Sequence, residues 1–255
     1  MNISLIQVFG AFLTIGIRLT GIMLFAPFFG SVVIPARVKA VLVLTMTALL
    51  YPALSPKIPL MNLSQWPMMV FGELLIGVAL GVATNIVFDG VQMAGQVLSV
   101  QMGYSLVNIL DPQTQVESTV MASFHQTVAM LIFLRLNVHF LILRALVHSF
   151  DYLPPFSGHF GAAFASSALE AGAAVFSIGI QIAAPVLSAT LLADIALGLL
   201  GKASPQLPLM LLGPAVKGIL GLMILISALK YWPDLFEHLF LNSMDKADHL
   251  LHLAQ

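Results

Sequence analysis

Long apolar stretches, separated by short polar or proline-bearing connections, dominate the chain. They lie at residues 4–29, 38–54, 66–88, 118–150, 168–200 and 212–232. Apolar stretches of about 20 residues predict helices that can cross a membrane. The prolines between them favour helix ends, because proline lacks the N–H group and restricts the residue before it. The pattern predicts an all-α protein of the integral membrane type, organised as a single helical domain over residues 1–255.

The end of the chain has a different pattern from the rest. Between residues 233 and 255, leucine and phenylalanine recur at helical spacing, with acidic residues and histidines between them. This predicts an amphipathic C-terminal helix. Its slightly acidic polar face suits packing on a partner better than binding to anionic lipid.

The composition agrees with a membrane protein and excludes several other classes. The chain is 59% hydrophobic and only 8% charged, whereas an ordinary soluble domain has roughly 25% charged residues. A net charge of -1 provides no basic field, so we expect no nucleic-acid partner. The lack of cysteine excludes disulfides and thiol catalysis. The sequence also lacks the common hydrolase and phosphate-loop motifs and a metal-ligand spacing of histidines, so we expect no enzyme, cofactor or metal site.

A polar stripe follows the third apolar stretch. On a helical projection its members fall on one face: Asp89, Gln92, Gln96, Ser99 and Gly103. Amide-rich and glycine-rich segments are tolerated at membrane depth where protein buries them or where they line a wet cavity. The stripe therefore either faces a channel or a neighbouring subunit, or holds helices together through amide hydrogen bonds.

The polar stripe leads into a loop that is uncharged until its aspartate. The loop consists of Leu106, Val107, Asn108, Ile109, Leu110, Asp111, Pro112 and Gln113. Its end is typical of a helix start, with Asp111 as the cap and Pro112 at the first helical position. The alternative is that the loop is a moving obstruction in a pore.

Charged residues inside apolar runs form a second group of candidates: Arg18, Glu73 and Asp194. A charge at the bilayer centre costs about 2.5–3.5 kcal/mol on insertion scales, so each should be buried against protein or water and have a partner. We expect Arg18 to pair with Glu73 or with Asp194. Such a pair is either structural or a proton relay or gating switch. Gly77 and Gly81 follow Glu73 in a G-x-x-x-G pattern, which is typical of tight helix packing within a chain or between subunits.

Short motifs follow one another in a fixed order over nearly the whole chain. They are residues 35–39 (PARVK), 72–81 (GELLIGVALG), 95–96 (GQ), 101–103 (QMG), 111–112 (DP), 194–198 (DIALG) and 205–206 (PQ). This ordered set resembles the FliR family of flagellar biosynthetic proteins and its virulence-secretion counterpart, the SctT family. Lys202 departs from the pattern, because the family usually has arginine there. Lysine keeps the point charge but lacks the planar fork that binds in a bidentate way.

The resemblance implies a core subunit of the export gate of a flagellar or type III secretion system, in the bacterial inner membrane at the base of the flagellum or secretion system. It implies long, kinked helical hairpins in a hetero-oligomeric assembly with FliP-type, FliQ-type and FlhB-type subunits, in contact with membrane lipid and unfolded export substrates. Residues 106–113 would be the plug segment that helps close the channel. The rival hypothesis is a stand-alone secondary transporter or ion channel that uses Arg18, Glu73 and Asp194 as its coupling charges.

Overall fold

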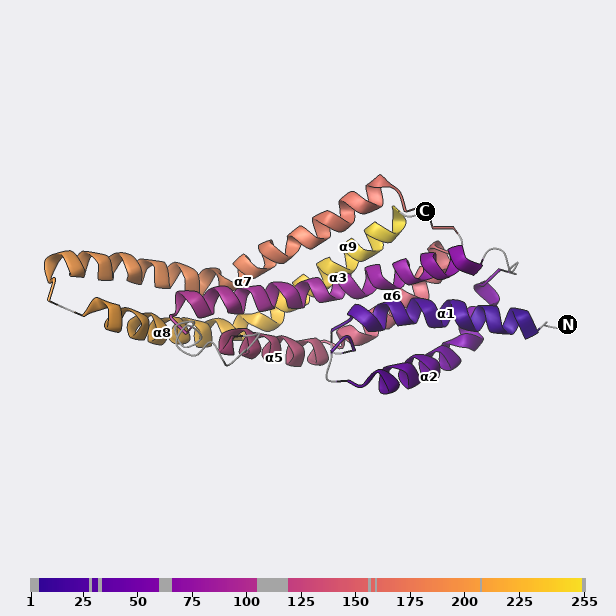
Figure 1. Ribbon diagram of the computed structural model, residues 1–255, viewed down its shortest axis with the longest axis horizontal. Helices are drawn as coiled ribbons and strands as arrows, with labels where there is room; N and C mark the ends of the chain where they lie inside the picture. Colours follow the sequence, from indigo (N-terminus) through magenta and orange to yellow (C-terminus); the bar gives the residue numbers. More distant parts are fainter. Residues whose placement is uncertain are drawn as a thin grey trace. The chain divides into compact units, whose positions relative to one another are not determined.

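The structure, a computed structural model, is built of helices (Figure 1). It describes residues 5–27, 29–31, 34–59, 66–104, 119–155, 157–158, 160–206 and 208–253. The α-helices are α1 (Leu5–Phe25), α2 (Ala36–Leu54), α3 (Trp66–Gln101), α5 (Val120–Arg135), α6 (Val138–Tyr152), α7 (Ala162–Ala203), α8 (Leu209–Ala228) and α9 (Trp232–His252), and the 3-10 helices are η1 (Ser55–Lys57) and η3 (Leu229–Tyr231). Every regular element in these residues is a helix, so the all-α prediction is confirmed.

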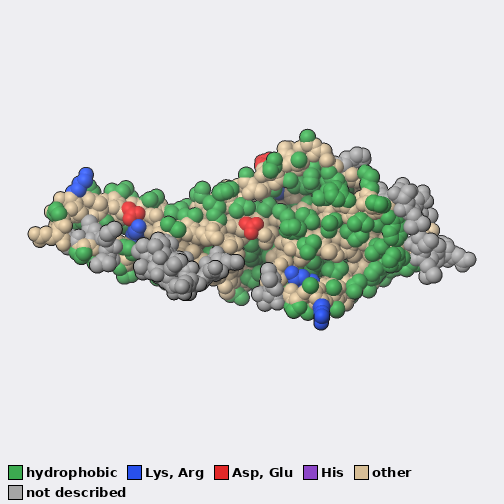
Figure 2. All heavy atoms as spheres, viewed as in Figure 1, with side chains coloured by type: hydrophobic (Ala, Val, Ile, Leu, Met, Phe, Trp, Pro, Cys, Tyr) green, Lys and Arg blue, Asp and Glu red, His purple; other side chains and the backbone are tan. Residues whose placement is uncertain are grey.

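Most of the helices have the length and composition of membrane spans. Within the described residues, five helices are long and apolar enough to cross a membrane, or six spans if α5 and α6 together count as one. On the face drawn in Figure 2, apolar side chains cover much of the surface and charged side chains are few. The predicted membrane-type composition of the helices is therefore confirmed.

Two helix boundaries differ from the simple apolar pattern. The third apolar stretch does not end at residue 88, because α3 continues without a break to Gln101 and carries most of the polar stripe. The fourth stretch is interrupted in the sequence by residues 135–139, which favours two short helices that meet at a bend, and the structure confirms this: α5 and α6 meet at Asn137, which has a left-handed φ of 55°. Asparagine tolerates this conformation better than most residues, because its short polar side chain can form local hydrogen bonds.

The chain forms two compact units. Unit 1 consists of residues 1–86, 137–173 and 240–255, and unit 2 consists of residues 87–136 and 174–239. The boundaries fall inside α3, α7 and α9 and between α5 and α6. The single domain expected over residues 1–255 stays a prediction.

In unit 1, α1 packs against α2 and supplies a continuous buried face (Figure 1). Ile15, Leu19 and Ile22 recur at helical spacing and are at most 2% exposed. The other helices of the unit add further buried apolar residues: Met69, Ile76, Leu80, Ile142, Leu146, Phe150, Phe240, Leu250 and Leu251. The apolar residues of the amphipathic C-terminal helix thus contribute to this core through α9.

The backbones of α1 and α3 approach so closely that glycine is required between them. A Cβ atom at Gly77 would lie 2.1 Å from the carbonyl oxygen of Arg18, and one at Gly21 would lie 2.7 Å from the carbonyl oxygen of Leu74. No other residue leaves room for this approach. Gly77 and Gly81 therefore serve packing within the chain, which is one of the two possibilities for the G-x-x-x-G pattern.

Unit 2 contains the last part of α3, which packs against α5 in the opposite direction. Phe88 packs edge to face on Phe133, with ring centroids 5.6 Å apart. Further along α3, Gln92 accepts a hydrogen bond of 3.1 Å from Nε2 of Gln126. Residue numbers thus rise along α3 as they fall along α5. The rest of the unit is formed by residues 174–239, which include α8 and the beginning of α9.

Candidate functional site

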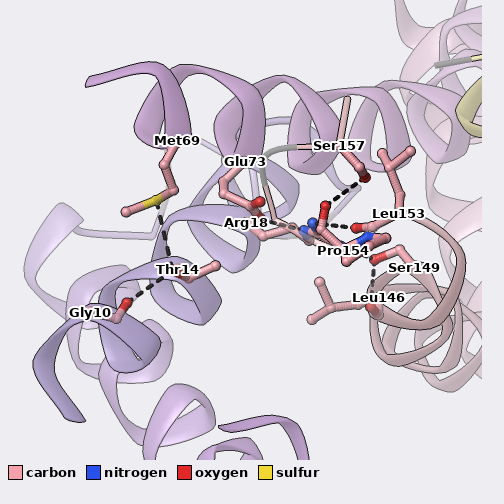
Figure 3. Close-up of polar contacts among 10 residues, drawn as sticks. All are labelled: Gly10, Thr14, Arg18, Met69, Glu73, Leu146, Ser149, Leu153, Pro154 and Ser157. Carbon is pink, nitrogen blue, oxygen red and sulfur yellow. Dashed lines mark hydrogen bonds and ion pairs between the residues drawn. The ribbon is translucent and has the colours of Figure 1, made fainter. Parts of the chain in front are cut away.

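Arg18 lies in the core of unit 1, between Glu73 on α3 and the end of α6 (Figure 3). Its Nε donates a hydrogen bond to Oε2 of Glu73 at 2.6 Å. Its Nη1 donates to Oγ of Ser149 at 2.8 Å, and its Nη2 donates to the carbonyl oxygen of Leu153 at 3.1 Å. The guanidinium carbon also lies 3.9 Å from the centre of the Phe150 ring, a cation–π contact. Of the two partners left open for Arg18, the structure brings it to Glu73.

This ion pair is closed to solvent and well supplied with partners. The side chains of Arg18 and Glu73 are 0% and 2% exposed. The bond to Leu153 satisfies a carbonyl group at the C-terminal end of α6, where a helix has no internal donors and favours a cation. Charges that couple to ion flow lie along a water-filled path or a relay of titratable groups. The burial and the bonds therefore favour the structural alternative for this pair over a relay.

The last turn of α6 also binds other parts of unit 1. Asp151 forms an ion pair with Lys57 of η1, and both side chains are partly exposed, at 48% and 37%. Next to it, the Tyr152 hydroxyl donates a hydrogen bond of 3.0 Å to Oδ1 of Asp248 on α9. Together with Arg18, these contacts tie α1, α3, η1 and α9 to the end of one short helix.

Asp194 lies in unit 2 and has different partners from Arg18. Its Oδ1 lies 2.9 Å from Nζ of Lys217 on α8, and its Oδ2 accepts a hydrogen bond of 3.0 Å from Nε2 of Gln101 on α3. The side chain of Asp194 is 42% exposed, so its expected burial is not found in this chain. Lys217 neutralises the carboxylate at this partly exposed position on α7, so Asp194 does have the partner that a charge in an apolar run needs. Sequence reasoning missed this cluster, because its members lie on three helices and no spacing relates them.

The polar stripe is confined to the last part of α3 and the turn after it, and its members have different surroundings. Asp89 and Gln96 are exposed, and Gln92 is half-buried and bound to α5. Ser99 is buried, and its hydroxyl has no hydrogen-bond partner among the residues that the structure describes. The bond at Gln92 agrees with a role in holding helices together. Contact of the stripe with a channel or a neighbouring subunit stays a prediction.

Gly103 ends α3 and does not extend its polar face. The N–H of Gly103 donates to the carbonyl oxygen of Val100 at 3.1 Å, and the N–H of Tyr104 donates to that of Ser99 at 2.9 Å. These are the hydrogen bonds of a Schellman motif, in which the residue after the cap is left-handed and is usually glycine. Gly103 has a φ of 84°, as this motif requires. The helical projection placed Gly103 on the stripe because it assumed that the helix continues.

The predicted plug loop, residues 106–113, lies outside the residues that the structure describes. Its two alternatives, a helix start and an obstruction in a pore, stay predictions. Within the described part of the chain, no group of three or more His, Asp or Glu side chains could hold a metal ion.

Most of the chain matches one family of known proteins. A family model for "Bacterial export proteins, family 1" covers residues 9–243. The chain belongs to this family. A relative of this bacterial export protein, the flagellar biosynthetic protein FliR of Bacillus subtilis (strain 168), is 29% identical over 258 residues, which is 98% of this chain and 98% of the relative.

Two other relatives of this bacterial export protein belong to flagellar and secretion systems. The flagellar biosynthetic protein FliR of Pectobacterium carotovorum subsp. carotovorum is 31% identical over 245 residues, covering 93% of this chain and 92% of the relative. The secretion system apparatus protein SsaT of Salmonella typhimurium (strain LT2) is 29% identical over 170 residues, covering 65% and 64%. The predicted membership of the FliR and SctT family of type III export is confirmed.

Proposed function

We propose that this bacterial export protein is a core subunit of the flagellar or type III protein export gate and forms part of the channel through which unfolded proteins are exported. Its location is the bacterial inner membrane, at the base of the flagellum or secretion system. Its partners are FliP-type, FliQ-type and FlhB-type subunits, membrane lipid and unfolded export substrates. Family membership supports the export role, and the surface of the helices supports assembly with other subunits.

The observation that carries the proposal is the excess of apolar helix in α7. This helix has 42 residues, about twice the 20 or so that a single membrane crossing needs. Large apolar side chains are exposed along it from Leu169, at 77%, to Leu200, at 51%. One crossing of the bilayer accounts for only about half of such a helix. The remaining apolar surface needs cover from protein, and partner subunits supply it in this proposal.

The channel part of the proposal rests on the polar stripe and on the loop after it. Amide and hydroxyl side chains such as Gln96 and Ser99 bind a passing polypeptide through weak, unspecific hydrogen bonds, which do not trap it. The resemblance to the FliR family implies that residues 106–113 are the plug. The sequence has no nucleotide-binding motif, so an ATPase or the proton-motive force, acting through partner proteins, drives export.

A stand-alone transporter has less support, because the charged residues that would couple its flux already have partners within the chain. Arg18 and Glu73 are nearly inaccessible to solvent and already have partners. Asp194 is bound to Lys217 and Gln101. Replacing Arg18 and Glu73 together by methionine separates the two functions, because it leaves no unpaired charge in the core. A transporter that uses these charges then loses coupled flux, whereas a gate subunit still assembles with its partners.

The first test of the proposal is to isolate the tagged chain in mild detergent after expression with its genomic neighbours. Intact-complex mass spectrometry should show a defined hetero-oligomer that contains other small hydrophobic subunits. A monomer or homo-oligomer with the neighbours present and unbound would contradict the proposal.

A second test addresses the channel directly. Deletion of residues 106–113 should raise the ion conductance of membranes that contain the assembled complex, because the plug is lost. Replacement of the same residues by a Gly-Ser linker of equal length controls for the shortened chain and should leak as well. Unchanged conductance in both variants would count against a plug. A photo-crosslinker at Asn108 should also capture a stalled export substrate if the loop borders the export path.

A further inference from the structure

The turn that ends α3 rests tightly on α8. It consists of residues 102–104 and directly precedes the stretch that leads to the predicted plug loop. A Cβ atom at Gly221 would lie 2.9 Å from Cγ of Met102, and one at Gly103 would lie 2.7 Å from Cβ of Pro214. At these distances a larger residue at Gly103 would press against Pro214 of α8, and a larger residue at Gly221 would require the Met102 side chain to move. The turn therefore fits on α8 only because small residues line the contact.

The residues of α8 that receive the turn share one face of the helix. They are Pro214, Gly218 and Gly221. Their spacing of four and three residues places them on one side of the helix, and Lys217 lies on the same side. We call Pro214, Gly218 and Gly221 the α8 seat. Lys217 is thus the charged residue next to the α8 seat.

Asp194 binds both Lys217, the neighbour of the α8 seat, and Gln101, the last residue of α3. One carboxylate oxygen lies 2.9 Å from Nζ of Lys217, and the other accepts a hydrogen bond of 3.0 Å from Nε2 of Gln101. A carboxylate is suited to this position because both of its oxygens accept hydrogen bonds and it offers no competing donor. Hydrogen bonds to a charged group are roughly twice as strong as neutral ones. Asp194 therefore holds the end of α3 and the α8 seat at the same time.

We infer that Asp194 is a positioning residue, which fixes the capped end of α3 on α8 by binding Gln101 and Lys217 together. The small residues of the α8 seat provide the fit, and the carboxylate provides directed bonds that keep the turn in place. The consequence for export rests on the proposed function, in which the chain leaves this turn towards the plug. The positioning itself does not depend on that function.

A cysteine at Met102 can report on the seating of the turn, because the chain contains no other cysteine. Met102 is 2% exposed, so the thiol of Met102→Cys should react slowly with a maleimide in the full chain in mild detergent. Adding Asp194→Ala should increase the reaction rate about tenfold, the factor that corresponds to the loss of a charge-assisted hydrogen bond. Asp194→Asn should give a smaller increase, since its amide can still form hydrogen bonds without the charge.

Control variants separate this effect from general destabilisation. Asp151→Ala removes another partly exposed carboxylate with a lysine partner, in unit 1, and should leave the labelling rate unchanged. Lys217→Met should increase the rate as Asp194→Ala does. Exchange of the two charges, Asp194→Lys with Lys217→Asp, should lower the rate again only in part, because it restores the ion pair but a lysine at residue 194 cannot accept the hydrogen bond from Nε2 of Gln101. This exchange also keeps the test open if Asp194→Ala does not fold.

A disulfide gives an independent measurement of the same contact. Cysteines introduced at Met102 and Gly221 should form a disulfide when a mild oxidant is added, because a Cβ atom at residue 221 would lie 2.9 Å from Cγ of Met102, the position that the sulfur of a cysteine at residue 102 would take. The oxidised fraction should be high with Asp194 present and should fall when Asp194→Ala is added. Equal labelling and equal oxidation with and without Asp194 and Lys217 would overturn the inference. Neither measurement requires export, whereas failure of the proposed function would be seen in the composition of the complex and in the conductance.

Discussion

Removing one partner of the buried Arg18 and Glu73 pair should destabilise the protein much more than removing both. Loss of one partner leaves an uncompensated charge in the core of unit 1, and such changes typically cost about 3–5 kcal/mol. Replacing both by methionine removes both charges and fills a similar volume, which is often neutral or stabilising. We therefore expect Arg18→Met and Glu73→Met to be strongly destabilised and the double variant to lose less, about 1–3 kcal/mol, because only the carbonyl oxygen of Leu153 is left without its donor.

The two single variants should also differ from each other. In Arg18→Met, the remaining carboxyl group can take up a proton and become neutral. In Glu73→Met, the remaining guanidinium keeps its charge, because arginine does not lose its proton in proteins. Arg18 then keeps Ser149, the carbonyl oxygen of Leu153 and the Phe150 ring as partners, and none of these carries a negative charge. Glu73→Met should therefore be the less stable of the two.

Thermal unfolding followed by circular dichroism in mild detergent measures these differences. For a chain of this size, about 3–5 kcal/mol corresponds to a fall in Tm of roughly 6–20 °C. The exposed pair of Lys57 and Asp151, with side chains 37% and 48% exposed, provides the matched control. Lys57→Met should cost about 0–1 kcal/mol, because solvent screens the pair.

One result would refute this reasoning. If the double variant were as unstable as the sum of the two single variants, the loss would come from packing around each side chain and not from an unpaired charge. The same conclusion would follow if Lys57→Met lowered Tm as much as Glu73→Met. The interaction energy from this double-mutant cycle is thus the decisive quantity.

Other substitutions test the packing of the helices, and Tm is the measurement for each. Gly77→Ala places a Cβ atom 2.1 Å from the carbonyl oxygen of Arg18 and should cost about 1–3 kcal/mol through overpacking. Gly172→Ala, with no described atom within 4 Å of the new Cβ, should instead stabilise α7 by about 0.5–1 kcal/mol. Asn137→Val should cost about 1–2 kcal/mol, because a β-branched residue disfavours the left-handed φ of 55°, whereas Asn137→Gly should be nearly neutral. Phe133→Ala, at a position 1% exposed, should cost about 3–5 kcal/mol through the cavity that it leaves.

The helices could be predicted from the sequence because their apolar residues are so numerous and so regularly placed. The same argument reduced the partners of Arg18 to two acidic residues, since a charge in an apolar run needs an opposite charge. It could not choose between them, because Glu73 lies 55 residues away and only the fold brings it near. The contacts of Arg18 with Ser149 and with the carbonyl oxygen of Leu153 left no signal, as serine is common in membrane helices and a backbone carbonyl has no sequence identity.

The polar stripe shows where a helical projection stops being valid. The projection placed Asp89, Gln92, Gln96 and Ser99 correctly on one helix, because α3 does continue to Gln101. It failed at Gly103, since the position of a helix end depends on hydrogen bonds that a periodic pattern does not contain. The cluster around Asp194 was missed for a related reason: its partners come from α3 and α8, and neither helix indicates the other in sequence.

α2 and α7 both leave most of their apolar surface exposed, and their lengths indicate whether lipid alone can cover that surface. α2 has 19 residues, close to the 20 or so of one membrane crossing. Of an apolar stretch of 18 residues within residues 36–57, only 11% is buried within the chain. Lipid alone can cover a helix of this length. In α7 only 22% of a corresponding stretch of 18 residues is buried, but the whole helix has 42 residues. No single crossing covers such a helix, and exposed apolar surface in water is unfavourable. The surface of α2 therefore fits a lipid boundary, whereas that of α7 agrees with the proposed assembly with other subunits.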